Sequence, residues 1–171
     1  MGASATPILT EVTGTFTASP TVGGNGVFLS DTGAPTLDVT TSADVEVQSA
    51  GTITVQMVDS GATVNLTLTG GSVVSGATGT DVLADALNVT ASGAVGSSSA
   101  PLDTSVSTLV ANGTSSGDID IANSGAVLAL NVVSTSSGSI TVTNVSNDLN
   151  AHSVTAGGSG NIVLMTTTTG R

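Results

Sequence analysis

The sequence predicts an all-β fold, a parallel β-solenoid whose coils of about 21 residues stack on one another. Two short patterns recur with this period. Leucines that open short apolar stretches stand at Leu87, Leu109, Leu130 and Leu149, and a glycine followed by two alternating aliphatic residues recurs from Gly117, Gly138 and Gly160. The chain has no Trp or Tyr and only two Phe. Aliphatic side chains must therefore fill the interior, which suits a narrow core repeated along an axis.

Residues 1–36 are the least regular part of the chain, and we expect them to form an N-terminal cap or an incomplete first coil. Two strand-like pieces lie at 10–17 and 26–30, and they hold both phenylalanines, Phe16 and Phe28. Residues 37–171 then form the coils of the β-helix.

Regular alternation of aliphatic and polar residues, the period of a strand with one buried face, begins at residue 37. It predicts short strands at 37–39, 45–47, 53–55, 64–68, 73–74, 82–83 and 87–89. Leu66 precedes Leu87 by one such period, so the repeat extends back at least to Leu66, and earlier coils are shorter or out of register.

A coil of this length suggests three strands of about four residues joined by three turns. We expect one inward column of Ile53, Ile119, Ile140 and Ile162, with Val55, Ile121, Val142 and Leu164 beside it. A second column would hold Leu66, Leu87, Leu109, Leu130 and Leu149. We also expect the glycines before the strands to supply positive φ at the corners.

The unit at 93–111 carries a glycine-aliphatic-glycine turn, a small polar loop, a proline-leucine-aspartate stretch and a Thr-Leu pair. In this unit and the strand that follows, the chain resembles bacterial repeat proteins of the filamentous-haemagglutinin type and related giant surface adhesins. The matching positions are Gly93, Val95, Gly96, Pro101, Leu102, Asp103, Thr108, Leu109, Gly117, Asp118 and Ile119. The resemblance covers about half of the chain, and it implies a right-handed parallel β-helix located on or outside the cell.

The last residues, 165–171, follow a strand without a polar cap. An uncovered last coil would leave an open strand edge that invites association. We therefore expect the natural chain to continue, or copies to associate end to end.

Charge limits the partners. Twelve acidic residues face one basic residue, Arg171, for a net charge of −11. A chain without lysine cannot neutralise phosphates, so nucleic-acid binding is not expected, and anionic lipid surfaces are disfavoured. No apolar run approaches the length of a membrane span.

Few residues could carry chemistry. His152 is the only histidine and lacks the companions that a triad or a histidine metal site needs. Asp118 and Asp120 alternate on one strand, so both should point outward as a weak candidate pair for Ca²⁺, as should Asp44 and Glu46. The stretch 157–164 faintly resembles a calcium-binding nonapeptide repeat, but it occurs once. No catalytic residue and no other cofactor is expected.

The leading interpretation is a non-catalytic structural or adhesive segment of a bacterial extracellular or cell-surface protein. Its partner would be a host or neighbouring-cell surface or a glycan. Three alternatives stay open: a self-assembling filament or lattice subunit, a β-helical carbohydrate-active enzyme, and an ice-binding solenoid. The last rests on the threonines at 52, 54, 141, 143 and 166–169, whose rows are interrupted by other side chains.

Overall fold

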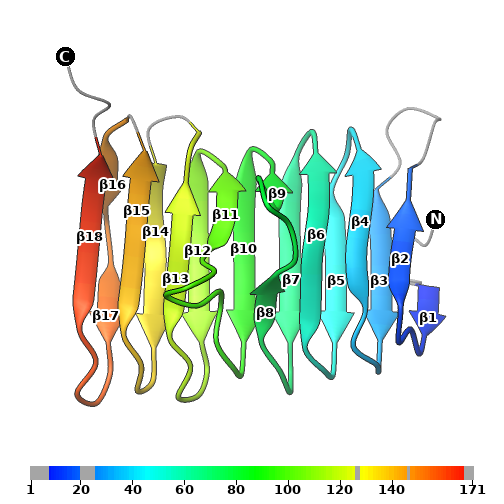
Figure 1. Ribbon diagram of the computed structural model, residues 1–171, viewed down its shortest axis with the longest axis horizontal. Coiled ribbons are helices and arrows are strands. Elements are labelled where there is room, and N and C mark those ends of the chain that lie inside the picture. The colour runs from blue at the N-terminus through cyan, green and yellow to red at the C-terminus, as the bar shows by residue number, and fades with distance from the viewer. Residues whose placement is uncertain (1–7, 20–25, 126–127, 146, 168–171) are drawn as a thin grey trace.

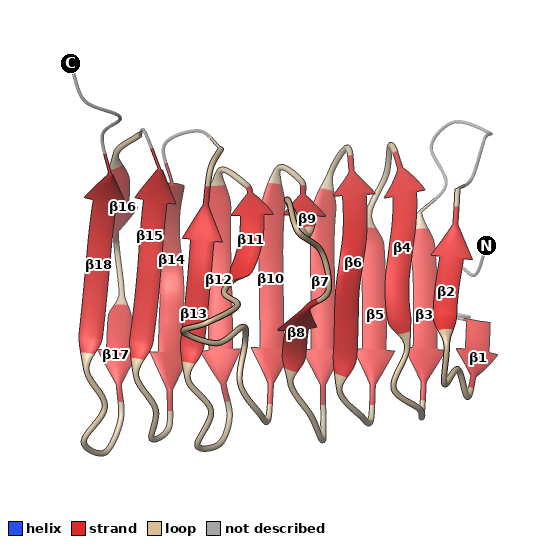
Figure 2. Ribbon diagram, in the orientation of Figure 1, coloured by secondary structure: helices blue, strands red, loops and turns tan. Residues whose placement is uncertain are grey.

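The computed structural model describes residues 8–19, 26–125, 128–145 and 147–167 as a β-solenoid of about seven turns (Figure 1). All named strands in these ranges pair in parallel with a strand one turn away, and the described residues include no helix (Figure 2). The predicted fold class is confirmed.

The strands form two facing sheets of nine strands each. The rear sheet of Figure 1 contains β1 (Ile8–Thr10), β3 (Val27–Asp31), β5 (Val45–Ser49), β7 (Thr63–Leu68), β10 (Ala86–Ala91), β12 (Thr108–Gly113), β14 (Leu128–Thr135), β16 (Leu149–Ala151) and β17 (Val154–Ala156). The front sheet contains β2 (Thr15–Ala18), β4 (Thr36–Thr41), β6 (Ile53–Ser60), β8 (Val73–Ser75), β9 (Val82–Leu83), β11 (Leu102–Ser105), β13 (Ile119–Asn123), β15 (Ile140–Val145) and β18 (Ile162–Thr167). Front strands run upward and rear strands downward while the turns advance to the left, so the coil is right-handed (Figure 1).

The prediction of three strands per coil is wrong, because each turn contributes to only two sheets. Strands run on through polar residues that resemble turns in the sequence. Asn123 and Asn144 end aliphatic alternations, yet both are fully buried. Their side chains bond to one another and to the backbone, so inward polar positions extend the strands.

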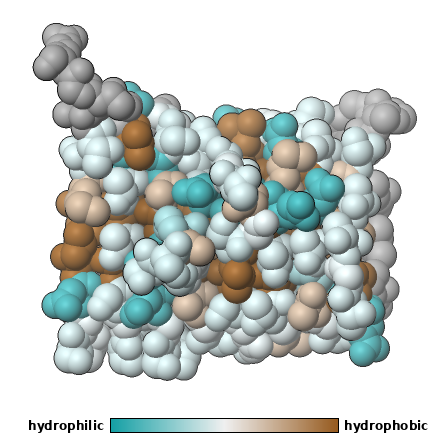
Figure 3. Space-filling model, in the orientation of Figure 1, coloured by the Kyte–Doolittle hydropathy of each residue, from teal (hydrophilic) through white to brown (hydrophobic). Residues whose placement is uncertain are grey.

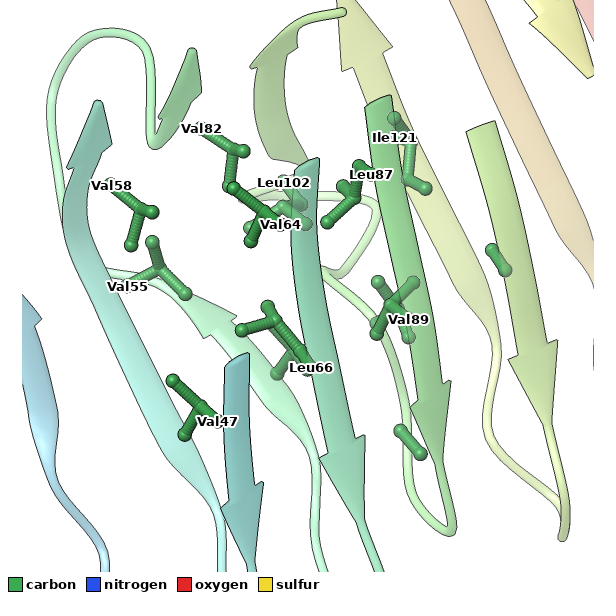
Figure 4. Close-up of a cluster of buried hydrophobic side chains, with 14 of the residues drawn as sticks. Val47, Val55, Val58, Val64, Leu66, Val82, Leu87, Val89, Leu102 and Ile121 are labelled. Carbon is green, nitrogen blue, oxygen red and sulfur yellow. The ribbon is translucent and has the colours of Figure 1, made fainter. Parts of the chain in front are cut away.

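The predicted isoleucine column is confirmed. The ladder runs from Ile53 through Val73, Val95, Ile119 and Ile140 to Ile162. Its first five members are 0 % exposed, because each turn buries the one before it. Figure 4 shows aliphatic side chains from both sheets, including Val55, Leu66 and Leu87, meeting in the space between the sheets.

The predicted leucine column is only partly correct. Leu87 pairs with Leu109, and Leu109 pairs with Leu130. Leu66, however, pairs with Val89, and Leu149 pairs with Leu128. The first error arises because the turn from Leu66 to Val89 is longer than the period of about 21 residues. The second arises because Leu128 and Leu149 keep that period, whereas Leu130 and Leu149 do not.

The corner glycines serve close packing rather than positive φ. Among the described glycines, φ is positive only at Gly96 and Gly158. One corner instead stacks a glycine ladder, one residue per turn: Gly33, Gly51, Gly71, Gly93, Gly117, Gly138 and Gly160. From Gly51 onward, an added Cβ would lie closer than 3.0 Å to the backbone of the preceding glycine, so a side chain does not fit.

Three strands lie within the segment expected to be a cap or an incomplete first coil. β1, β2 and β3 join the same ladders as later strands, and Phe16 on β2 pairs with Leu37. The described part of this segment therefore has the backbone pattern of the coils that follow.

Candidate functional site

Two loops interrupt the regular front sheet. Residues 76–81 join β8 to β9, and residues 96–101 join the bridge residue Val95 to β11 (Figure 1). The turns that contain them are long. Val82 lies opposite Val58 and Ile119 lies opposite Val95, and these are the widest sequence separations between ladder partners in the described part of the chain. The extra residues have no place in the stack and therefore project from the front sheet.

Asp81 anchors the first loop. Its side chain is 0 % exposed and accepts hydrogen bonds from the Asp103 backbone N–H (2.8 Å), the Ser75 hydroxyl (3.1 Å) and the Ala77 N–H (3.3 Å). Burial raises the pKa of this carboxyl above its ordinary value, although these hydrogen bonds oppose the shift. The carboxylate thus ties the loop to strand β11.

The second loop is closed on itself. The N–H of Ser97 donates to the carbonyl of Ala100 (2.9 Å), and the Ala100 N–H donates back (3.1 Å). Gly96 adopts a φ of 68° at the start of the loop, which glycine tolerates best. Ser97, Ser98 and Pro101 line a hollow together with Asp120 of the neighbouring strand β13.

The predicted calcium pair lies beside this loop. Asp118 is exposed and accepts a hydrogen bond from the Ser139 N–H (2.7 Å). Asp120 is only 8 % exposed, although its position in the strand alternation faces outward. Burial raises the pKa of the Asp120 carboxyl; a hydrogen bond from Thr141 lowers that pKa, and the negative charge of Asp118 raises it further.

The two carboxylates are near enough to interact, but they differ in exposure. No group of three or more His, Cys, Asp or Glu suited to a metal ion occurs among the described residues. Calcium binding by this pair therefore stays a prediction.

Two hollows on the front sheet share the lining residue Ala122, and together they are called the groove. One end, of about 230 Å³, is lined by Gly79, Thr80, Asp103, Ala122, Asn123, Ser124 and Val145. The other end, of about 250 Å³, is lined by Ser97, Ser98, Pro101, Asp120, Ile121, Ala122, Thr141, Thr143 and Met165. Ala122 lines both ends, so the two hollows are adjacent on the sheet. Figure 3 shows this face, with polar residues projecting near its centre and apolar surface toward its C-terminal end.

The other predicted polar residues are not gathered here. His152 is exposed, and its backbone N–H bonds to Leu130 on the rear sheet. Asp44 accepts a hydrogen bond from the Thr63 N–H, and Glu46 accepts one from Gln48, also at the rear sheet. None of these three residues lines the groove.

The predicted threonines Thr54, Thr141 and Thr143 do not stack on one another. Thr54 stacks between Thr36 and Val74, whereas Thr141 stacks between Asp120 and Val163. Thr143 has Ala122 and Met165 as its neighbours. Among the described residues these threonines therefore do not form one continuous row, and ice binding stays a prediction.

Sequence reasoning missed Asp81 and the groove itself. The available signal was turn length, because the two longest described turns contain the two loops. The sequence period alone could not distinguish a turn that carries an inserted loop from a turn in which the repeat pattern is merely weak.

Comparisons with protein-family models, curated proteins and solved structures found no match to this chain. Within the described residues, no helix is long and apolar enough to cross a membrane. The functional argument therefore rests on the geometry of the chain itself.

Proposed function

We propose that this chain is a non-catalytic β-solenoid segment of a bacterial extracellular or cell-surface protein, a stiff scaffold that presents a glycan-binding groove. The observation that carries this proposal is the pair of loops on one sheet. Both project from the front sheet, and each loop lines one end of the groove. The remaining turns stack in register and supply the rigid support.

Continuous stacking supports the scaffold role. Parallel ladders connect β1 to β16 in the rear sheet and β2 to β18 in the front sheet. A repeat structure of this kind gains its stability from contacts between neighbouring turns. Such a rod holds the groove at a fixed distance from its ends.

The groove chemistry favours a neutral or amino-sugar polymer. Its lining offers hydroxyls, such as those of Thr80 and Thr143, and the carboxylates of Asp103 and Asp120. These oxygens accept hydrogen bonds from sugar hydroxyl and amino groups. A net charge of −11 repels acidic glycans and attracts cationic ones.

Binding to immobilised polysaccharides tests this proposal. The purified chain is applied to dextran, to partly deacetylated chitin and to hyaluronan, and bound protein is measured at low and physiological salt. Retention on partly deacetylated chitin or dextran but not on hyaluronan is expected. Release of new reducing ends from any of the three polymers would contradict the non-catalytic assignment.

Matched variants separate the groove from the overall charge. Thr143→Arg places a long cation in the groove and should abolish binding to the polysaccharide. Thr67→Arg makes the same change at an exposed position on the rear sheet, and this variant should still bind. An equal loss of binding in both variants would show that binding depends only on the net charge of the protein, and it would refute the groove as the binding site.

A further inference from the structure

The second loop of the front sheet is inserted at the ladder position of one residue. Val95, just before the loop, lies opposite Ile119. Leu102, just after the loop, lies opposite Ile121. Only Asp120 stands between Ile119 and Ile121, so the whole loop takes the place of the single residue that would face Asp120. The loop therefore leaves the sheet directly beside Asp120.

Gly96 allows the chain to leave the sheet at this point. Its φ of 68° lies in the left-handed region that glycine favours. A Cβ built on Gly96 would lie closer than 3.0 Å to the backbone oxygen of Asp120, so a side chain does not fit. The loop then closes on itself through the hydrogen bonds between Ser97 and Ala100. The hollow beside Asp120 is thus walled by a loop that is fixed at its start and within itself.

Asp120 is the charged group of this hollow. It lines the hollow from the outer face of β13, yet it is only 8 % exposed. Thr141, its ladder partner in the next turn, donates a hydrogen bond to the carboxylate. A carboxylate has about four acceptor positions, so a donor that enters the hollow can also bind to it.

No cation of the described part of the chain neutralises this carboxylate. The described ranges contain neither Lys nor Arg, and their single histidine, His152, lies at the rear sheet. Burial raises the pKa of the Asp120 carboxyl, and the negative charge of Asp118 raises it further. Carboxylates that lose contact with water are normally paired with a positive charge. A cationic ligand would supply that charge.

The hollow suits a small polar ring. Its volume of about 250 Å³ lies below the roughly 300–1,000 Å³ of pockets for drug-sized ligands. Ser97, Ser98 and Thr143 offer hydroxyls, which both donate hydrogen bonds to sugar hydroxyls and accept them. Pro101 adds an apolar surface. These groups fit one sugar residue that carries a positive charge.

A divalent metal ion fits this hollow less well. Calcium takes about 6–8 oxygen ligands, and carboxylates are prominent among them. Asp120 is the one acidic side chain among the residues that line the hollow, and Asp118 does not line it. An ammonium group, in contrast, is satisfied by one carboxylate and a few hydroxyls.

We propose that the hollow beside the second loop binds the ammonium group of an amino sugar through Asp120, which gives the groove a preference for free amino sugars over N-acetylated ones. This assignment rests on the function proposed above, because it specifies the charged contact within the same groove. An N-acetylated amine carries no positive charge and cannot form the ion pair. The degree of acetylation of the glycan would therefore control its affinity.

Calorimetric titration of the full 171-residue chain tests this preference. The ligands are glucosamine oligomers and N-acetylglucosamine oligomers of equal length, at a pH at which the free amino groups are protonated. The parent chain should bind the glucosamine oligomers at least about tenfold more tightly, because hydrogen bonds between charged groups are the stronger ones. Equal affinities would overturn the ammonium site while the glycan-binding proposal stands. Failure to bind either oligomer or dextran would refute both.

Matched variants locate the ammonium group. Asp120→Asn keeps the shape of the side chain and should lose about tenfold in affinity for the glucosamine oligomers. Asp118→Asn makes the same change of net charge two residues away and should keep most of that affinity. Asp103→Asn, at the other end of the groove, should do likewise. A loss in either control as large as that in Asp120→Asn would overturn the assignment to Asp120.

A polyamine separates the sugar from a bare amine. Spermidine offers ammonium groups without a hydroxylated ring, so it should bind the parent chain at least about tenfold more weakly than the glucosamine oligomers. This comparison and that of the two oligomers need only the parent chain, so they decide the question even if Asp120→Asn does not fold. Spermidine that binds as tightly as the glucosamine oligomers would overturn the amino-sugar assignment.

Discussion

Asn123 donates a hydrogen bond from its Nδ2 to the Oδ1 of Asn144, 2.8 Å away, so that two fully buried amides stack between neighbouring turns. Asn123 also accepts from the Val106 N–H (2.9 Å) and the Thr104 hydroxyl (2.9 Å), and it donates to the Val106 carbonyl (3.1 Å). The amide thus satisfies the backbone at the corner where β11 ends. The apolar columns supply burial, whereas this polar pair supplies directional bonds.

Replacing Asn123 by Ala should lower the free energy of unfolding by about 2–4 kcal/mol, because it leaves several buried polar groups without partners. Urea unfolding followed by circular dichroism measures the change. Asn150→Ala, at an exposed position on β16, is the control and should shift stability by less than about 0.5 kcal/mol. Equal losses of stability in Asn123→Ala and Asn150→Ala would show that the hydrogen bonds of the buried asparagine pair do not add to the stability of the fold.

A charge at Ile140 should be far more damaging. This side chain is 0 % exposed in the isoleucine column, so Ile140→Asp buries an unpaired carboxylate. We expect a loss of more than about 4 kcal/mol, or failure to fold at room temperature. Thermal unfolding of Ile140→Asp, compared with that of the exposed control variant Leu83→Asp, tests this prediction. A well-folded Ile140→Asp variant would contradict the placement of Ile140 in a buried column.

The glycine ladder predicts a steric effect. Gly117→Ala should cost about 2–3 kcal/mol, because the new methyl group would meet the backbone of Gly93 closer than 3.0 Å. Gly79→Ala is the matched control, since nothing lies within 4 Å of a Cβ built there. Comparable urea midpoints for the two variants would mean that the turns can separate at this corner without cost.

Asp81 predicts a defined pH dependence. Its folded-state pKa is raised above 3.8 by burial, so at pH values between 3.8 and that raised pKa the folded state binds more protons than the unfolded state. Lowering the pH through this window should therefore stabilise the parent chain relative to Asp81→Asn, and the gain should level off below 3.8. Urea midpoints of both proteins, measured from neutral pH down to this lower limit, give the change. A difference in urea midpoint between the two proteins that stays constant with pH would refute the raised pKa of Asp81.

Much of the fold could be predicted from sequence because the repeat is a local pattern. Alternation of aliphatic and polar residues predicts strands, and their regular recurrence predicts stacking. For that reason the isoleucine column from Ile53 to Ile162 is correct. Where turn length varies, the same reasoning fails, and it pairs Leu66 with Leu87 rather than with Val89.

The sequence by itself determined the class of this protein: parallel strands, a narrow aliphatic core, and a charge that disfavours nucleic acids. Only the tertiary structure decided that each turn runs through two sheets, because buried Asn123 and Asn144 resemble turn residues until their bonding partners are known. It also decided which residues meet at the groove. Asp103 becomes a neighbour of Thr80, and Asp120 becomes a neighbour of Thr143, only through stacking, which no local pattern of residues encodes.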